Sequence, residues 1–227
     1  MTCRTILQWP DKKLSEISLP VGNDITEEVI ANVTDVIDTL KASFGVGLAA
    51  PQVGIRKRIL AIDPTVAQIE NPYPQEEFAE YLVLIDPELE VSGNEFTWNE
   101  ACLSVPFLSA AVKRKPLVSL KFTNLKGERV ELNLTMPLSG IIQHENDHLD
   151  GILFIDRAGR FVKERLVKKM KKEARQRKQE DESVRQQIIL ETQGQAGLRK
   201  YLSQKSNTKK TIRKKNSKKF GRNKKRR

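Results

Sequence analysis

The chain of 227 residues has two histidines, His144 and His148, which are four residues apart. On an α-helix this spacing places both side chains on one face, roughly 5–6 Å apart at their Cβ atoms, so both imidazoles can bind one metal ion. Glu145 follows the first histidine, where its carboxylate can accept a proton from a water molecule on that metal. The pattern predicts a hydrolytic metal centre. The alternative is a helix with two incidental histidines.

A third metal ligand must come from another part of the chain, because a catalytic metal site usually has three protein ligands and one open position for water. Cys102 is one candidate, since a thiolate binds transition metals and the residue follows a segment of strand character. Glu164 is the other candidate and would give the site of a zinc peptidase. The residue types leave both open, because a lone cysteine is often only a small buried hydrophobic residue.

Three helices are predicted around these residues. A capping residue followed by Glu27 and Glu28 starts an amphipathic helix that runs to about Ser43. The second helix, residues 137–149, carries both histidines and is apolar on most sides, so we expect it to be buried. The third, residues 161–179, is dominated by Lys and Arg with a thin apolar stripe.

Short segments of strand character lie between the first two helices, at residues 58–62, 81–85, 89–91, 96–98, 117–122 and 130–134. A hairpin turn is expected at residues 124–127, so the last two strands should pair in antiparallel fashion. The expected fold class is α+β, with antiparallel or mixed β-sheets wrapped around a central buried helix that bears the His-Glu-x-x-His motif.

The charge divides the chain into an acidic body and a basic C-terminal part. Residues 1–156 contain 13 Lys and Arg against 23 Asp and Glu, a net charge of −10, whereas residues 157–227 contain 27 against 6, a net charge of +21. We therefore expect a catalytic domain over residues 1–160, a basic helix over 161–179, and a basic, disordered tail over 180–227. The tail predicts a polyanionic partner, with a solubilising role as the alternative.

The compartment follows from the start of the chain and its cysteines. Met-Thr-Cys-Arg-Thr is a polar start, and no apolar run approaches the roughly 18 residues that suggest a membrane span. Cys3 and Cys102 lie far apart in the sequence, which fits a reducing compartment. We expect no signal or transit peptide, no membrane partner and a cytoplasmic location.

Residues 45–54 (Gly-Val-Gly-Leu-Ala-Ala-Pro-Gln-Val-Gly), 100–104 (Glu-Ala-Cys-Leu-Ser) and 143–149 (Gln-His-Glu-Asn-Asp-His-Leu) closely resemble the three signature motifs of peptide deformylases, in the same order and at similar separations. Residues 6–14 also look like the start of that family, so the resemblance covers about residues 1–175. It implies a metal-dependent hydrolase that removes the formyl group from the N-terminal formylmethionine of nascent polypeptides and releases formate.

The resemblance implies three ligands for one divalent metal ion: Cys102, His144 and His148. The ion is usually ferrous iron, with zinc, nickel or cobalt as alternatives. Glu145 would be the general base. The side-chain amide of Gln52 and the backbone N–H of Leu103 would stabilise the oxyanion.

The resemblance also implies how the substrate is held. Its backbone would pair, in strand fashion, with the segment formed by Gly45, Val46 and Gly47. Ile141 and His144 would line an apolar pocket for the methionine side chain. A buried ion pair that braces the cysteine loop would be formed by Glu100 and Arg114, for which an ordinary surface pair is the alternative.

Three positions depart from the usual family pattern. Ala101 stands where most bacterial members have glycine, Ser109 where many carry an arginine that helps to hold the peptide, and Gly140 where an aliphatic pocket residue is usual.

In family members the basic C-terminal helix can dock at the ribosomal exit, so the resemblance implies ribosomal RNA as the partner of the basic tail. Two other functions remain open from the residues, a zinc peptidase that uses Glu164 and an RNA-binding protein with a structural metal.

Overall fold

The computed structural model describes the backbone of residues 3–223 and the side chains of residues 3–204, apart from residues 174, 177–178, 193–194 and 196–198. The chain divides into two compact units, Met1–Leu166 and Val167–Arg227. The first unit contains both histidines and every strand of the described residues. Among the helices that the structure describes, none combines the length and apolarity that crossing a membrane requires.

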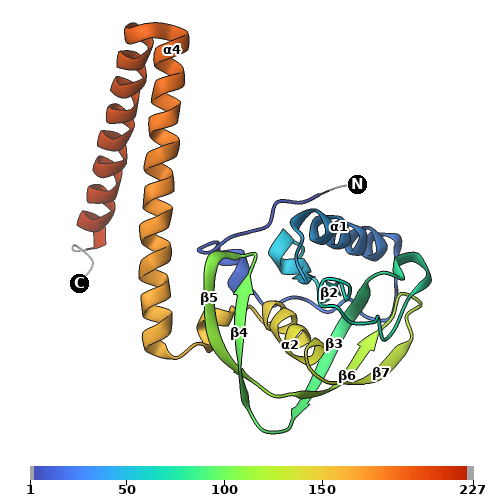
Figure 1. The fold of residues 1–227 in the computed structure, drawn as a ribbon. Coiled ribbons are helices and arrows are strands. Elements are labelled where there is room, and N and C mark those ends of the chain that lie inside the picture. Colours follow the sequence, from blue (N-terminus) through green and yellow to red (C-terminus); the bar gives the residue numbers. More distant parts are fainter. Residues whose placement is uncertain (1–2, 224–227) are drawn as a thin grey trace. The chain divides into compact units, whose positions relative to one another are not determined.

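A five-stranded antiparallel sheet forms the centre of the first unit (Figure 1). Its strands, in spatial order, are β1 (Gly47–Ala49), β2 (Ile59–Ile62), β3 (Leu82–Ser92), β6 (Leu117–Thr123) and β7 (Arg129–Leu134). A separate antiparallel pair consists of β4 (Phe96–Cys102) and β5 (Val105–Arg114). The fold is therefore α+β, as the sequence predicted.

The large sheet is buried on both faces around β2, which explains why the sequence of this strand is wholly apolar. Ile59 and Ala61 belong to a cluster with the apolar side of α1 (Glu27–Ser43), whereas Leu60 and Ile62 face a second cluster with α2 (Leu138–Leu149). Successive side chains of a strand point to opposite faces, so a strand between two helices needs apolar residues at every position.

The helix α2 lies between the large sheet and the β4–β5 pair (Figure 1). Pro137 precedes its first residue, and Ile142 and Leu149 are fully buried in the cluster beneath the sheet. The helix was predicted from its nearly continuous apolar surface, and the structure confirms that it is buried. Its polar residues must therefore find partners inside the protein.

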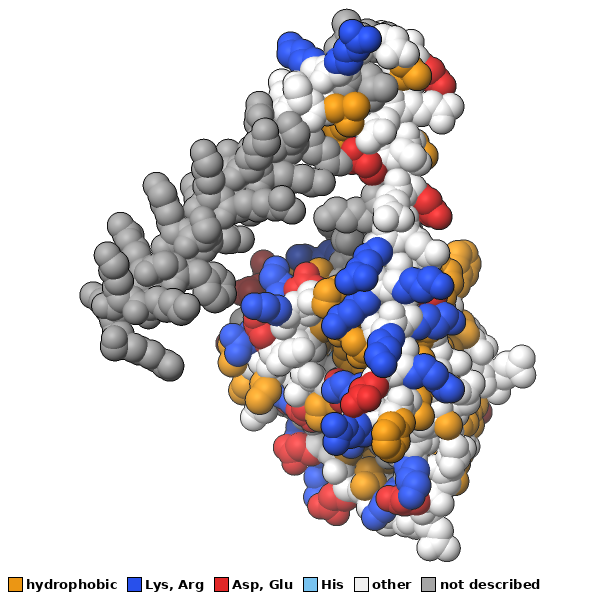
Figure 2. Space-filling view, turned by 90° about the vertical axis from the view of Figure 1, so that its left-hand side faces the viewer, with side chains coloured by type: hydrophobic (Ala, Val, Ile, Leu, Met, Phe, Trp, Pro, Cys, Tyr) orange, Lys and Arg blue, Asp and Glu red, His pale blue; other side chains and the backbone are white. Residues whose placement is uncertain are grey.

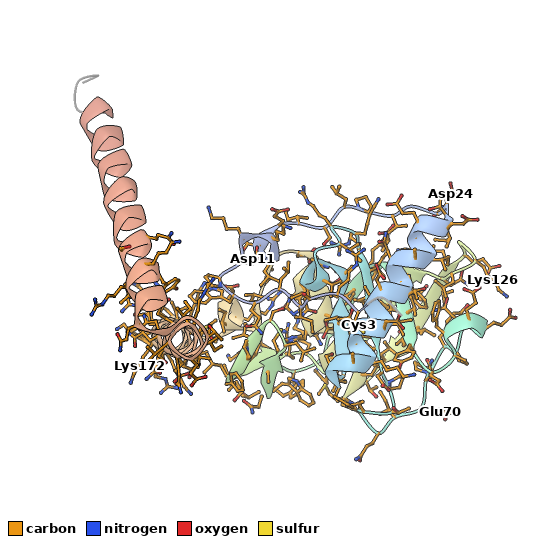
Figure 3. The ribbon with its side chains drawn as sticks, turned by 90° about the horizontal axis from the view of Figure 1, so that it is seen from above. Cys3, Asp11, Asp24, Glu70, Lys126 and Lys172 are labelled. Atoms are coloured by element: carbon orange, nitrogen blue, oxygen red, sulfur yellow. The ribbon has the colours of Figure 1, made fainter. Side chains whose placement is uncertain are left out.

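The first helix, α1, begins as the acidic pattern indicated, with Thr26 as its N-cap. Near its start lies the turn between β6 and β7, where Gly127 approaches the carbonyl of Asn23. Lys126 and Asp24 mark these two segments in Figure 3. The antiparallel pairing expected from this turn is confirmed by the β6–β7 register.

Several strands differ from the prediction, which did not include β1 and ended β4 at Trp98. The segments 81–85 and 89–91 form one strand, β3, with an irregularity between Ile85 and Glu88 where Asp86 has a φ of 48°. The strand β5 was not predicted, although Leu108, Ala110 and Val112 alternate with exposed residues. Pro106 near its start obscured that alternation.

The expectation of disorder over residues 180–227 stays a prediction, although the structure assigns residues 180–223 to a helix. A four-residue helix, α3 (Phe154–Arg157), precedes α4 (Arg160–Asn223), and residues 224–227 lie outside the described part. Low apolar content predicts that a segment cannot form a core, but Lys, Arg, Gln and Glu are good helix formers.

The long helix α4 also bends. The Tyr201 hydroxyl lies 3.2 Å from the Glu182 carboxylate, whereas 19 residues of straight helix would span about 28 Å. The chain therefore reverses between these residues, as Figure 1 shows.

Candidate active site

Two elements carry the predicted metal ligands. The strand β4 ends with Cys102 beside the turn into β5, and α2 presents His144 and His148 one helical turn apart. The ligand atoms of the three residues all lie within 4.8 Å of one another, and Cys102 Sγ is 3.2 Å from His148 Nε2. The structure thus brings together residues that are up to 46 positions apart in the sequence.

The alternative third ligand lies elsewhere. Glu164 forms an ion pair with Arg160 on the surface of α4, with an N–O distance of 3.2 Å. Its carboxylate is outside the group formed by Cys102 and the two histidines. A thiolate and two imidazoles are ligands that zinc, ferrous iron and related ions accept, so the donor set fits a transition metal.

A carboxylate orients the first histidine. Glu100 Oε2 lies 2.7 Å from His144 Nδ1, an arrangement that leaves Nε2 directed at Cys102. Burial alone would lower the pKa of His144, but its hydrogen bonds to Cys102 and Glu100 outweigh burial and raise this pKa well above its ordinary value. The surroundings therefore favour a positive charge at this position, which is the property a metal site needs.

The second histidine has the opposite electrostatics. Burial, together with the charges of His144 and Arg114, lowers the pKa of His148 well below its ordinary value, so its imidazole is neutral at neutral pH. A neutral imidazole has the free lone pair that binds a metal. Its Nδ1 atom is buried without a hydrogen-bond partner among the described residues.

Glu145 lies beside these ligands and is almost completely buried. Burial is the main cause that raises its pKa to about 7, with Glu100 and Asp147 adding to the effect and His144 opposing it. Its Oε2 atom has no hydrogen-bond partner among the described residues. A carboxylate with a pKa near neutrality can both accept and return a proton.

Gly47 of β1 makes room for this carboxylate. A Cβ atom at this position would lie 2.7 Å from Glu145 Oε1, closer than real Cβ contacts allow. Glycine is therefore required at position 47, because β1 and the Glu145 side chain of α2 approach each other too closely for a Cβ atom. The edge of β1 thus lies directly against the proposed reaction centre.

Gln52 is 2% exposed and directs its amide nitrogen at the cysteine. The backbone N–H of Ala49 donates to its Oε1 at 2.8 Å, which determines the orientation of the amide. Its Nε2 lies 3.1 Å from Ser104 Oγ and 3.5 Å from Cys102 Sγ. Leu103, between the last two residues, is in the β4–β5 turn.

A buried network of ions supports the β4–β5 pair and α2. Arg114 binds Glu100 through Nε at 2.6 Å and Asp147 through Nη1 at 2.8 Å, and the three side chains are at most 6% exposed. Arg157 of α3 binds both carboxylate oxygens of Asp147 and shares Oδ2 with Arg114. The sequence left a buried and a surface ion pair open for Glu100 and Arg114. In the structure the pair is buried, and each of the two side chains has at least two charged or hydrogen-bonding partners.

An open cleft of about 850 Å³ runs past these residues. Gly45, Val46 and Gly47 are among the residues that line it, and so are Ile141 and His144. All five were expected at the substrate, and the structure places them in this one cleft.

The departures from the family pattern also lie in or near this cleft. Ala101 and Ser109 are paired across the β4–β5 hairpin, and both line the cleft. A Cβ atom at Gly140 would lie 3.1 Å from Met136 and 3.6 Å from Trp98. These two side chains therefore occupy the space that an aliphatic residue would otherwise fill.

Sequence reasoning missed four residues of the site. Ser104 accepts the Gln52 amide, Asp147 joins Arg114 to Arg157, and the Phe154 ring stacks on His144 at 6.3 Å. Asp147 and Ser104 stood within the quoted motifs, so their polar side chains beside the ligands were a usable signal. Phe154 and Arg157 carried none, because their contacts arise only from the short helix α3.

Comparisons with known proteins agree on one family. The sequence profile described as polypeptide deformylase matches residues 3–164. A peptide deformylase of Rhizorhabdus wittichii is 39% identical over 179 residues, which cover 78% of this chain and 99% of that protein. One of Phenylobacterium zucineum is 36% identical over 176 residues, covering 77% and 99%.

Solved structures give the same result. A peptide deformylase from Legionella pneumophila matches with a TM-score of 0.67 and 32% identity, over 78% of this chain and 98% of that one. A Plasmodium falciparum peptide deformylase in complex with an inhibitor matches with a TM-score of 0.64 and 30% identity, over 75% and 99%.

Proposed function

Because this chain belongs to the polypeptide deformylase family, we propose that Cys102, His144 and His148 hold the metal ion on which the reaction of that family depends. The enzyme removes the formyl group from the N-terminal methionine of nascent peptides. The observation that carries the proposal is the convergence of the three ligand atoms within 4.8 Å, next to the buried Glu145.

Cys102, His144 and His148 would hold a divalent cation, which would supply a Lewis acid that lowers the pKa of a water molecule and polarises the formyl oxygen. Glu145 takes the proton of the attacking water, whose oxygen forms a bond to the formyl carbon. Glu145 then returns the proton to the methionine nitrogen as the carbon–nitrogen bond breaks, which yields formate and a free amino terminus. Its pKa of about 7 suits both transfers.

The negative charge that develops on the formyl oxygen is stabilised by Gln52 Nε2 and the backbone N–H of Leu103. The Ala49 N–H holds the Gln52 amide in the orientation that this role needs. The substrate backbone adds to the open edge of β1 along Gly45, Val46 and Gly47. The methionine side chain enters the inner part of the cleft beside Ile141.

The metal that we propose for the cell is ferrous iron, with zinc, nickel or cobalt as alternatives. The affinity of such a site for divalent ions follows the order of the divalent series and is higher for zinc than for ferrous iron. The ion found after purification therefore depends on which metals were available to the protein. We place the enzyme in the cytoplasm, where its formylated substrates are made.

The test is formate release from formyl-Met-Ala-Ser by protein purified without oxygen and loaded with ferrous, nickel or zinc ions. We expect turnover with ferrous and nickel ions and none after a chelator removes the metal. Inert protein with a full complement of metal would contradict the proposal.

The basic helix α4 is the surface that we propose for ribosomal RNA. Figure 2 shows Lys and Arg side chains gathered along it. A groove on this helix is lined by Lys168, Lys171, Lys172 and Arg175, which follow one helix face. Contacts between such cations and phosphates are insensitive to sequence and weakened by salt.

A charge-neutral variant tests this partner. Lys168, Lys171, Lys172 and Arg175 are replaced together by glutamine, and binding to ribosomes is measured by sedimentation at increasing salt. The slope of log affinity against log salt should decrease by about 3 if all four contact phosphates. The matched control replaces Lys12, Lys13, Lys113 and Lys126 of the first unit. If the α4 variant, the control variant and a chain lacking residues 180–227 all bound ribosomes as tightly as the wild type, the proposed role of the basic C-terminal part would be contradicted.

A further inference from the structure

The side-chain amide of Gln52 has two N–H groups, and the proposed function uses one of them for the developing oxyanion. In the structure Nε2 donates to Ser104 Oγ at 3.1 Å and lies 3.5 Å from Cys102 Sγ. Cys102 belongs to the proposed metal ligands, so the N–H on its side is the one that can reach an oxygen atom beside the metal. The other N–H is held by Ser104.

The Gln52 amide is thus held at both of its ends. The Ala49 N–H donates to Oε1 at 2.8 Å, and Ser104 Oγ accepts from Nε2. The terminal torsion of a glutamine side chain has no sharp preference of its own. Two hydrogen bonds at opposite ends of the amide fix the orientation of its plane, which one bond alone does not do.

Ser104 is fully buried in the turn between β4 and β5. Burying a hydroxyl group is costly unless the group is hydrogen-bonded, and the partner of this hydroxyl is the Gln52 amide. Alanine at this position would avoid that cost. The bond to Gln52 therefore accounts for a serine in this turn.

A segment near the start of the chain ties the two partners together through their backbones. The Leu7 N–H donates to the Gln52 carbonyl at 2.7 Å, and the Trp9 N–H donates to the Ser104 carbonyl at 2.9 Å. Gln52 lies in the 3₁₀ turn η2 (Ala50–Val53), whereas Ser104 lies between β4 and β5. One short segment thus helps to fix the separation of the donor and the acceptor.

We propose that Ser104 is a positioning residue of the reaction, whose hydroxyl holds the Gln52 amide so that the second N–H points at the formyl oxygen. Ser104 is not among the described residues that line the cleft, so it acts through Gln52 and not on the substrate. The inference rests on the proposed function and adds to it the group that orients the oxyanion donor.

The first test is a double-mutant cycle on the full chain loaded with nickel ions. Ser104→Ala should lower kcat for formyl-Met-Ala-Ser by about 10–100-fold, since a misplacement of about 1 Å can cost about 10²-fold. KM should stay near its wild-type value, because the oxyanion charge exists only in the transition state. In a Gln52→Ala background the same substitution should have no further effect on kcat, since the group that Ser104 positions is gone.

Ser139 provides the matched control. It is also fully buried, and its hydroxyl donates to the Pro116 carbonyl at 2.8 Å. Ser139→Ala loses a buried hydrogen bond of the same kind outside the cleft lining. It should lower the Tm, as Ser104→Ala does, but leave kcat at the wild-type value.

A second measurement reports on the amide without any turnover. Zinc-loaded protein labelled with ¹⁵N at its glutamines should show two side-chain N–H signals of Gln52, assigned by their loss in Gln52→Ala. Both protons should exchange slowly with water in the wild type, because both are buried and held by acceptors. In Ser104→Ala one of them should exchange roughly tenfold faster, as expected for the loss of one hydrogen bond.

Two results would overturn this inference alone: wild-type amide exchange in Ser104→Ala, or a loss of kcat that persists in the Gln52→Ala background. Equal losses of kcat in Ser104→Ala and Ser139→Ala would also overturn it, because Ser104 would then have only a structural role. A nickel-loaded wild type that releases no formate would overturn the proposed function and this inference with it, even if amide exchange showed the bond to Ser104.

Discussion

Replacing Glu145 by glutamine should reduce kcat for formate release by about 10²–10⁴-fold, the usual contribution of a general acid–base group. Glutamine has nearly the same shape, so it fits beside Gly47, but it cannot accept the proton of the attacking water. The ligand atoms of Cys102 and the two histidines are unchanged. Metal content and KM should therefore stay close to the wild-type values.

The matched control is Glu164→Gln, which makes the same substitution in a glutamate that pairs with Arg160 on the surface. It should leave kcat and metal content unchanged. If Glu164→Gln lost its metal, the site would be that of a zinc peptidase with a ligand on α4. If Glu145→Gln kept full activity, another group would have to move the proton.

Replacing Cys102 by alanine should weaken metal binding by more than about 100-fold. Loss of a residue that merely orients a ligand costs about 10–100-fold, and Cys102 provides one of the three donor atoms itself. Because a ligand that binds only the folded state stabilises it, added metal should raise the Tm of the wild type but hardly that of the variant. Elemental analysis of the purified proteins gives an independent measurement.

The other cysteine gives the control. Cys3 is exposed and its Sγ lies 3.5 Å from the carbonyl oxygen of Asp38, beside α1 as Figure 3 shows. Cys3→Ala should bind metal like the wild type. Retention of a full metal complement by Cys102→Ala would rule out the proposed ligand set and leave the two histidines with an unidentified third ligand.

The buried ion network compensates the charged side chains around the site, because each of them lies beside a group of opposite charge. His144, Glu100, Arg114 and Asp147 alternate in sign along one path, and Arg157 ends the path on α3. Breaking a buried pair by removing one partner typically costs about 3–5 kcal/mol, so the network also determines how β4, β5 and α2 are held together.

The sequence by itself predicted the elements whose periodicity is strong. The apolar surface of residues 137–149 predicted a buried helix, and the four-residue spacing of His144 and His148 predicted one metal-facing side of it. The turn at residues 124–127 predicted the antiparallel β6–β7 pair. These features depend on local geometry, which neighbouring residues determine.

Local patterns failed where two criteria competed. Pro106 hid the strand β5, and low apolar content suggested disorder over a segment whose residues are good helix formers. Composition alone therefore did not predict the strand β5.

Only the tertiary structure decided between Cys102 and Glu164 as the residue that joins the two histidines, and between a buried and an exposed Glu100–Arg114 pair. It also placed Phe44 and Phe107 on one cleft, which their distant positions do not indicate. Sequence periodicity reports which side of an element is apolar. It does not report which distant element packs against that side, because the packing depends on the combined shape of the sheet, the β4–β5 pair and α2.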